Sequence, residues 1–231
     1  MKICTLCPRM CAVDRKSGER GICGQTTEIK VARAALHFWE EPCISGEMGS
    51  GAVFFSGCAL HCVFCQNENI ANGTAGKVIS TERLGEIFLE LQEKGANNIN
   101  LVTPGQFVPQ IIKAVELARN QNLKIPIVYN TSSYENVDTI RSLEGIVDIY
   151  LPDFKYFDTA LSAKYSHAPD YPAVAKAVIA EMVRQTGVAV FENGEDSLMK
   201  RGTIVRHLIL PGCTKDSKAV LKYLHLSLIH I

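Results

Sequence analysis

The densest group of chemically reactive side chains is an eight-residue stretch that contains Cys58, Cys62 and Cys65. An apolar run, residues 52–55, comes just before it and predicts a buried strand, so the three thiols lie on a loop that leaves a strand. Cysteine thiolates bind zinc ions and iron–sulfur clusters, which usually take four ligands. Three thiolates therefore predict a metal site with one position open for a cofactor or substrate. The alternatives are unliganded buried thiols or half of a zinc ribbon, and this spacing is more specific than a lone Cys-x-x-Cys.

Four further cysteines, Cys4, Cys7, Cys11 and Cys23, lie near the start of the chain. Proline and glycine are interspersed among them, so we expect a turn-rich segment rather than a helix or a strand. Four thiolates could close a tetrahedral zinc site or hold a second iron–sulfur cluster, and the alternative is a set of reduced, unliganded cysteines. Because residues 1–24 have almost no apolar core, a metal would supply much of their folding energy.

The composition narrows the class of protein. A chain of 231 residues with 47% apolar residues suits one sizeable α/β domain, or a domain with a small appendage. Lysine and arginine together number 24, as do aspartate and glutamate, so no net charge favours nucleic acid or a membrane surface as a partner. We find neither an apolar run long enough to span a bilayer nor a signal-peptide core. Seven of the nine cysteines lie in the two sets with metal-ligand spacings, which indicates metal binding rather than disulfides, and we expect a cytoplasmic protein.

The chain divides into three regions. Residues 1–24 form the cysteine-rich segment, residues 25–50 connect it to the rest, and residues 51–231 carry a regular α/β pattern. In the connecting region, residues 31–39 could be a strand or a short helix, and residues 40–46 are predicted to be a loop. His37 and Cys43 stand alone there and are expected to be structural residues.

Strands and helices alternate from residue 51 onward. The predicted strands are residues 52–55, 99–102, 125–129, 147–151 and 204–210, and the predicted helices begin at Ser80, near Pro109, at Val137 and at Pro172. Such alternation predicts parallel βα units whose strands are buried on both faces. Each strand ends in polar or turn residues, and active sites of parallel barrels form at the carboxyl ends of the strands. We therefore expect these ends to converge on the three-cysteine loop.

Several stretches together resemble one family. They are residues 4–11, 41–46, 55–67, 100–104, 148–155 and 205–212. In these the chain is similar, from residue 1 to about residue 223, to the uncharacterised iron–sulfur proteins of the radical S-adenosylmethionine (SAM) superfamily named pyruvate formate-lyase activating enzyme-like. The resemblance implies a partial (β/α) barrel, which usually has six βα units. This chain supplies five, and residues 223–231 depart from the family pattern. We therefore expect residues 51–231 to form a barrel truncated before the sixth strand.

The resemblance also implies the cofactors and the reaction. Cys58, Cys62 and Cys65 would hold a [4Fe–4S] cluster, and SAM would chelate its open iron. One electron from the reduced cluster would cleave SAM to methionine and a 5′-deoxyadenosyl radical that abstracts a hydrogen atom. The expected partners are a flavodoxin- or ferredoxin-like electron donor and a glycyl-radical enzyme, with no nucleic acid and no membrane.

Further site residues follow from the resemblance one by one. Those implied to contact SAM are Phe64 at the adenine, Thr103 at the methionyl amine, Asn130 and Thr131 near the carboxylate, and the pair Asp153 and Lys155; Arg206 is implied to face the substrate. The alternatives are a core aromatic for Phe64, a surface ion pair for Asp153 and Lys155, and a structural role for Arg206. Gln106 replaces a histidine that we would expect in this subfamily, and His207 is predicted to be a core residue.

Three functions remain open at this point. The first is a radical SAM oxidoreductase that installs a glycyl radical on a partner enzyme. The second keeps the radical chemistry but directs it at a small molecule or another protein. The third is a non-catalytic protein whose two cysteine sets bind zinc or iron–sulfur clusters for structure or sensing.

Overall fold

The computed structural model describes residues 3–193 and 197–227 and contains one eight-stranded sheet. Its strands are β1 (Ile29–His37), β2 (Ser50–Phe55), β3 (Lys77–Ile79), β4 (Ile99–Val102), β5 (Ile127–Thr131), β6 (Ile149–Pro152), β7 (Val190–Phe191) and β8 (Met199–Thr203). They are ordered β3-β1-β2-β4-β5-β6-β8-β7. The run from β2 to β8 is parallel, whereas β1, β3 and β7 pair antiparallel at the two edges. The sheet is open, as in a partial (β/α) barrel, and confirms the predicted α/β class.

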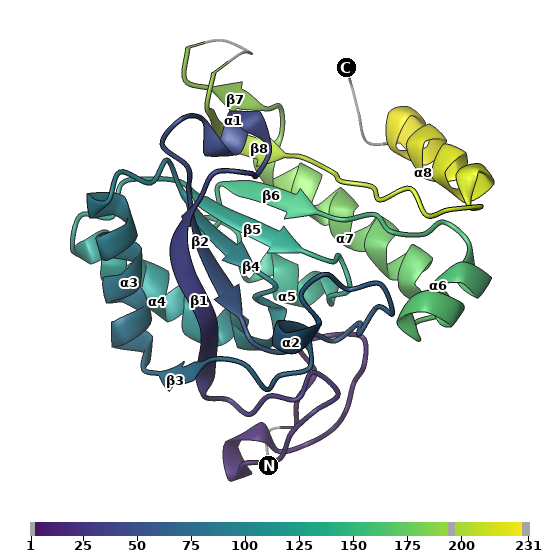
Figure 1. Ribbon diagram of the computed structural model, residues 1–231, viewed down its shortest axis with the longest axis horizontal. Coiled ribbons are helices and arrows are strands. Elements are labelled where there is room, and N and C mark those ends of the chain that lie inside the picture. Colours follow the sequence, from purple (N-terminus) through teal and green to yellow (C-terminus); the bar gives the residue numbers. More distant parts are fainter. Residues whose placement is uncertain (1–2, 194–196, 228–231) are drawn as a thin grey trace.

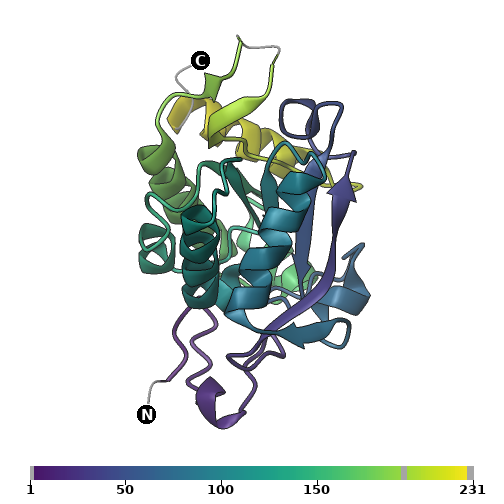
Figure 2. The same cartoon turned by 90° about the vertical axis from the view of Figure 1, so that its left-hand side faces the viewer.

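Helices follow the parallel strands. They are α1 (Pro42–Ser45), α2 (Glu68–Ala71), α3 (Thr81–Glu93), α4 (Val108–Asn120), α5 (Val137–Arg141), α6 (Thr159–Ser166), α7 (Tyr171–Thr186) and α8 (Thr214–Ser227), with short 3-10 helices at Arg15–Ser17 and Gly105–Phe107. Because the parallel strands lie in chain order, each crossover returns on the same side. The helices α3, α4, α5 and α7 therefore cover one face of the sheet (Figures 1 and 2). Within the described residues, no helix is both long enough and apolar enough to cross a membrane.

The main core lies between these helices and the sheet. Alternate residues of the strands point into it, among them Val53, Leu101 and Tyr129, which are fully buried. Local signals start and stop the surrounding helices: the Ser80 side chain accepts a hydrogen bond from the backbone N–H of Arg83 and begins α3. This agreement between local pattern and buried face explains why most predicted elements are confirmed.

The opposite face of the sheet carries a smaller apolar layer. Ile44 of α1 packs there against Val128, Ile149 and Leu151, near the amino ends of the parallel strands. The helical turn α1 replaces the loop that was predicted for residues 40–46. A proline at its first position and the apolar contact of Ile44 favour the turn.

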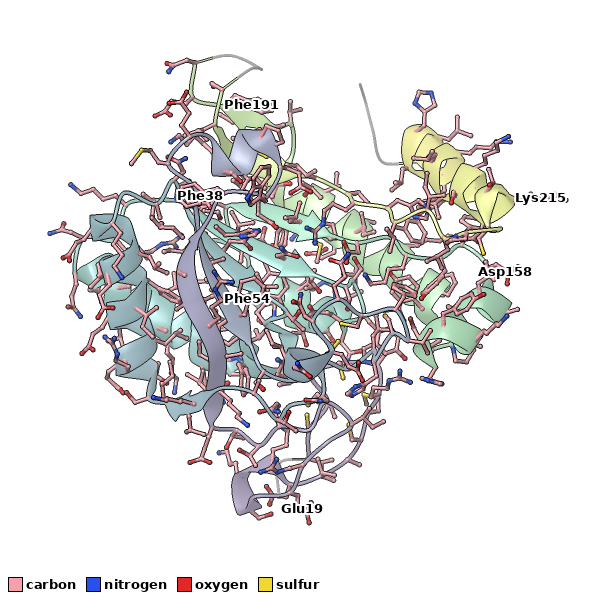
Figure 3. The ribbon with its side chains drawn as sticks, in the orientation of Figure 1. Glu19, Phe38, Phe54, Asp158, Phe191 and Lys215 are labelled. Atoms are coloured by element: carbon pink, nitrogen blue, oxygen red, sulfur yellow. The ribbon has the colours of Figure 1, made fainter. Side chains whose placement is uncertain are left out.

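The strand directions place the first residues of the chain at the carboxyl end of the barrel. His37, at the end of β1, pairs with Ser50 at the start of β2, so residues before Ile29 lie where the parallel strands finish. Figure 3 shows Phe38 and Phe191 at one end of the sheet and Glu19 at the other. The cysteine-rich segment therefore lies at the end where barrel active sites form.

The fifth parallel strand is not where we predicted it. It runs from Met199 to Thr203, and of the predicted residues 204–210 only Arg206 forms a β-bridge, with Asp153. The chain leaves the sheet after Arg206, so Leu208 and Ile209 remain exposed. Their apolar character suggested a strand, whereas the real strand is largely polar and carries little strand signal. The helices α6 and α8 and the strand β7 were not predicted either.

Candidate active site at the carboxyl ends of the strands

The cysteine loop, residues 58–65, extends directly from β2. Its Leu60 is fully buried in an apolar cluster that α6, α7 and α8 also line. The backbone N–H of Val63 donates to the carbonyl of Tyr165 at 2.9 Å, and the Ser166 hydroxyl donates to Cys62 Sγ at 2.9 Å. The barrel thus supplies the contacts that position this loop.

Burial raises the pKa of the Cys58 thiol, the N–H groups of Leu60 and His61 oppose the rise, and Cys62 and Cys65 add to it. Among residues 3–193 and 197–227, no three His, Cys, Asp or Glu side chains are placed to hold one metal ion. A cluster has a different requirement, because each cysteine binds a different iron.

Strand ends surround the cysteine loop as predicted. Thr103 follows β4 with a φ of 56°, a left-handed conformation that is rare for a β-branched residue. The buried Gln106 amide donates to the carbonyls of Ser56, Gly57 and Thr103, at 2.9, 3.0 and 2.9 Å. Gln106 therefore ties the end of β4 to the start of the cysteine loop, which is a positioning role for the residue that replaces the expected histidine.

A polar layer lies on the face of the sheet away from the main helices. Glu40 Oε2 accepts hydrogen bonds from the amides of Asn100 and Asn130, at 3.0 and 3.1 Å. Arg206 completes the layer, because its guanidinium donates to Asp153 Oδ1 at 3.0 Å and to Asn130 Oδ1 at 2.6 Å. The predicted site residues Asn130, Asp153 and Arg206 are therefore in direct contact. Glu40 was missed, since its partners lie sixty or more residues away and it matches no local motif.

Lys155 and Asp153 form a partly buried ion pair rather than a surface one. Lys155 Nζ lies 2.6 Å from Asp153 Oδ2, and 16% and 23% of the two side chains are exposed. Burial alone would raise the pKa of Asp153, but Lys155 and Arg206 outweigh it and lower that pKa below its usual value. Burial likewise opposes the charge of Lys155, yet Asp153 and the thiolates of Cys62 and Cys58 raise its pKa. Both groups are therefore ionised, and Lys155 interacts electrostatically with Cys62 and Cys58 of the cysteine loop.

Thr131 does not join this layer. Its hydroxyl donates to Glu135 Oε1 at 2.6 Å, and Tyr129 donates to Glu135 Oε2 at 2.8 Å, on the helix side of the sheet. Burial raises the pKa of Glu135. Thr131 and Asn130 thus point to opposite sides, as neighbours on a strand must.

Phe64 packs edge-on against Tyr156, with ring centroids 6.4 Å apart, and joins the apolar cluster that holds Leu60. His207 is held by Phe154 and Ser217: its Nδ1 lies 2.6 Å from the Phe154 carbonyl and its Nε2 lies 2.9 Å from the Ser217 hydroxyl. Both rings have structural partners here, although His207 is half-buried and not the core residue that we predicted.

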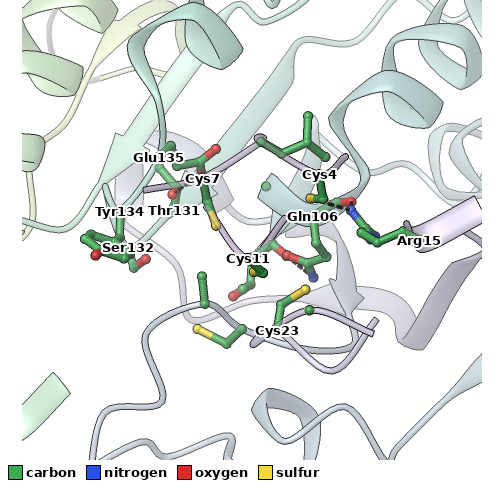
Figure 4. Close-up of a pocket in the computed structure, with 16 residues that line it drawn as sticks. Cys4, Cys7, Cys11, Arg15, Cys23, Gln106, Thr131, Ser132, Tyr134 and Glu135 are labelled. Carbon is green, nitrogen blue, oxygen red and sulfur yellow. Dashed lines mark hydrogen bonds between the residues drawn. The ribbon is translucent and has the colours of Figure 1, made fainter. Parts of the chain in front are cut away.

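Two cavities meet at Cys58. One is bordered by the ends of β2 and β4 and by α2; its lining residues are Phe54, Phe55, Gly57, Cys58, Asn67, Ile70, Ala71, Val102 and Thr103. The other lies under the N-terminal cysteine segment, residues 4–23. Figure 4 shows Cys4, Cys7, Cys11 and Cys23 around it, and Cys58, Ala59, Thr103 and Gln106 also line it. The structure therefore brings both cysteine sets to the same end of the barrel.

Arginines attach the N-terminal cysteine segment to the barrel. Arg9 donates to the carbonyls of Ala59, Ser166 and His167, at 2.8, 3.0 and 2.5 Å, and its guanidinium lies 5.0 Å from the centre of the Tyr134 ring. Its contacts therefore span the cysteine loop and the end of α6. Arg9 was missed from the sequence, because bonds to backbone carbonyls have no sequence signature.

Comparisons with known proteins agree with this geometry. Residues 52–222, most of the chain, match the family model described as the radical SAM superfamily. The chain is also 26% identical over 217 residues to an uncharacterised protein, MJ0674, of Methanocaldococcus jannaschii; the match covers 91% of this chain and 57% of the relative. The chain thus spans little more than half the length of that relative. It belongs to the radical SAM superfamily, which implies a [4Fe–4S] cluster and SAM as cofactors.

Proposed function

We propose that the chain is the catalytic part of a radical SAM oxidoreductase, with Cys58, Cys62 and Cys65 as the ligands of its [4Fe–4S] cluster. The observation that carries this proposal is the position of Cys58, Cys62 and Cys65 on one loop at the carboxyl ends of five parallel strands. Three thiolates leave one iron without a protein ligand, and SAM would occupy it. When bound, the cluster supplies the electron that cleaves SAM and so generates a radical.

The residues around the loop fit the groups that SAM presents. Its methionyl part carries a carboxylate and an amine, and its sulfur is positively charged. Lys155 would attract the carboxylate, with the Asn130 amide as a further donor, while Asp153 and Glu40 supply negative charge for the amine and the sulfonium. The cavity between Phe54, Val102 and Thr103 offers apolar walls for the adenine, whereas Phe64 is already engaged by Tyr156. These residues would bind and orient SAM.

Arg206 would meet the substrate at the outer side of the polar layer. Its side chain is 30% exposed, and its Nη1 lies 3.7 Å from Glu40 and 3.9 Å from Glu41. Glu41, with 28% of its side chain exposed, reaches the same edge. A substrate can therefore approach the polar layer from solvent, as a polypeptide loop would need to do. This accessibility allows a substrate to reach the layer, and the resemblance to activating enzymes suggests that the substrate is the glycine of a glycyl-radical enzyme. A flavodoxin- or ferredoxin-like protein would donate the electron.

Anaerobic reconstitution with iron and sulfide tests the chemistry. The reduced chain should convert SAM to 5′-deoxyadenosine, and a Cys62→Ala variant should not. Cys213→Ala is the matched control, because Cys213 belongs to neither cysteine set, and it should retain the activity. A colourless wild-type chain that binds only zinc, or a Cys62→Ala variant as active as wild type, would contradict the proposal.

The identity of the substrate needs a separate experiment. After incubation with a candidate glycyl-radical enzyme, the reduced chain and SAM should generate the EPR doublet of a glycyl radical on that partner. An Arg206→Leu variant should weaken this transfer more than it weakens cleavage of SAM alone. If SAM is consumed without a radical on the partner, and its consumption is coupled to turnover of a small molecule, the result would instead support a radical SAM enzyme that acts on a small molecule.

A further inference from the structure

The N-terminal cysteine segment presents four thiols to one cavity. Figure 4 shows the sulfur atoms of Cys4, Cys7, Cys11 and Cys23 around this space. All four are free cysteines, so no disulfide accounts for their position. We propose that these four cysteines hold a second iron–sulfur cluster, with all of its ligand positions filled by the protein. This proposal concerns different ligands from the proposed function and can fail or succeed independently of it.

A buried cation without a carboxylate partner supports an anionic group at this place. Arg15 is only 5% exposed, and it donates to the carbonyls of Gln25, Thr26 and Gln106 and lies 3.9 Å from Cys4 Sγ. Within the part of the chain that the structure describes, no carboxylate forms an ion pair with it. A buried charge is costly unless an opposite charge compensates it. Four thiolates around a cluster would supply that negative charge next to the guanidinium.

The segment also lacks the apolar core that would order it. From residue 3 to residue 24, only Arg15 and Cys23 are buried, and the only regular element is the 3-10 helix Arg15–Ser17. A metal centre bound by the four cysteines would form a crosslink at the middle of the segment.

The cavity that the four thiols share can accommodate a cluster. Residues of the barrel, including Gln106 and Thr131, form its other walls. An iron–sulfur cluster would fill such a space, because each cysteine binds its own iron while inorganic sulfide fills the centre.

The full chain, reconstituted anaerobically, allows the two clusters to be separated. A Cys58→Ala/Cys62→Ala/Cys65→Ala variant should keep about two to four iron atoms per chain, with a matching amount of sulfide. Its EPR spectrum after reduction should be unchanged by SAM, since no iron of the second cluster is open. A Cys7→Ala/Cys11→Ala variant should lose this iron and keep a cluster whose EPR spectrum responds to SAM. Cys213→Ala should keep the iron content of the wild type.

Two results would overturn the proposal. One is a triple variant that shows the circular dichroism of the wild type but binds no iron. The other is a wild-type chain that binds zinc at the N-terminal cysteine segment, with a stoichiometry that Cys7→Ala/Cys11→Ala removes. In both cases a SAM-responsive cluster in the wild type would leave the proposed function standing. If the triple variant does not fold, the iron and sulfide contents of the wild type and of Cys7→Ala/Cys11→Ala are compared instead. The proposal predicts a lower content in the double variant, and equal contents would overturn the proposal.

Discussion

The two cysteine regions reach the same cavity but are held there in different ways. The cysteine loop continues from β2, and Leu60 anchors it in an apolar cluster. None of the described residues before Gly24 belongs to a buried apolar cluster. The N-terminal cysteine segment is attached by hydrogen bonds of Arg9 and Arg15 to carbonyls of the barrel, and of Asn136 and Thr139 to the carbonyls of Thr5 and Leu6. The two proposed sites would explain this difference. A cluster held by three cysteines keeps one iron open, so the barrel would have to hold the geometry of the cysteine loop, whereas four cysteines and their cluster would hold each other.

The cations of the two regions differ in whether a carboxylate is paired with them. Lys155, near the cysteine loop, is paired with Asp153 at 2.6 Å. Arg15, within the N-terminal cysteine segment, donates to backbone carbonyls and lies near Cys4 Sγ and over the Phe107 ring, and no carboxylate of the described residues forms an ion pair with it. The charge of Lys155 is thus balanced by a carboxylate, whereas the proposed second cluster would balance the charge of Arg15.

Alanine substitutions of one cysteine in the cysteine loop and of one in the N-terminal cysteine segment should have the largest and most different effects. Cys62→Ala should reduce formation of 5′-deoxyadenosine to the background without enzyme, because the cluster that cleaves SAM loses a ligand. Cys11→Ala should leave a SAM-responsive cluster but lower the free energy of unfolding. Chromatographic assay of 5′-deoxyadenosine, together with thermal unfolding of both variants, provides the comparison. If Cys62→Ala and Cys11→Ala lost SAM cleavage to the same extent, the two cysteine sets would not have the separate roles that we propose.

A glycine tests the contact between the two regions. Gly57 precedes Cys58 with a φ of 90°, and a Cβ atom there would collide with the Cys23 carbonyl. Gly57→Ala should therefore lower the free energy of unfolding by about 3 kcal/mol. Gly18→Ala is the matched control, since Gly18 has a φ of 94° and open space around its Cα, and it should cost about 1 kcal/mol. Urea denaturation measures both, and equal losses would place the N-terminal cysteine segment away from Gly57.

Removal of Arg9 should loosen the attachment of the N-terminal cysteine segment. Arg9→Ala deletes three hydrogen bonds to carbonyls and the contact with Tyr134, and we expect a loss of about 2 kcal/mol. Hydrogen exchange should become faster in residues 4–23 but not in β4 or β5. Arg20, whose side chain makes one hydrogen bond of 3.4 Å, offers a control: Arg20→Ala should cost less than about 0.5 kcal/mol. Unchanged exchange in Arg9→Ala would mean that other contacts hold the segment.

The ion pair near the cysteine loop predicts a small pH dependence. Because the pKa of Asp153 is lowered on folding, its stabilisation is complete above the unfolded pKa of about 3.9 and is lost as the pH falls through the folded value. Lys155→Met should reduce the free energy of unfolding by about 1 kcal/mol near neutral pH. The difference from wild type should shrink below about pH 4. Lys113→Met, at an exposed position of α4, should show no such trend in urea titrations across this range. A difference that stays constant in acid would contradict the role of Asp153.

Local patterns predicted the elements that depend on neighbouring residues. Ser80 begins α3, Gly187 ends α7 and β4 has the predicted bounds, because capping and burial of these elements are visible within a few residues. The parallel order then follows from the alternation of strands and helices, and it brings the strand ends to the cysteine loop.

Contacts between distant parts of the chain were not predictable in this way. Glu40 reaches Asn100 and Asn130 from the connecting region, and Arg9 reaches the end of α6. No periodicity or spacing encodes such contacts. The strand β8 was misplaced for a related reason. It lies near an edge of the sheet and is largely polar, so its sequence lacks the apolar pattern that predicts a buried strand. The predictions of individual SAM contacts and of the partners remain predictions.

The most direct test of the open metal position is the EPR spectrum of the reduced, reconstituted chain before and after addition of SAM. Three protein ligands predict that SAM changes the signal of the cluster in the wild type and in Cys11→Ala, and that this change is absent in Cys62→Ala. A wild-type cluster whose spectrum is indifferent to SAM would contradict the account, because every iron would then already have its full set of ligands.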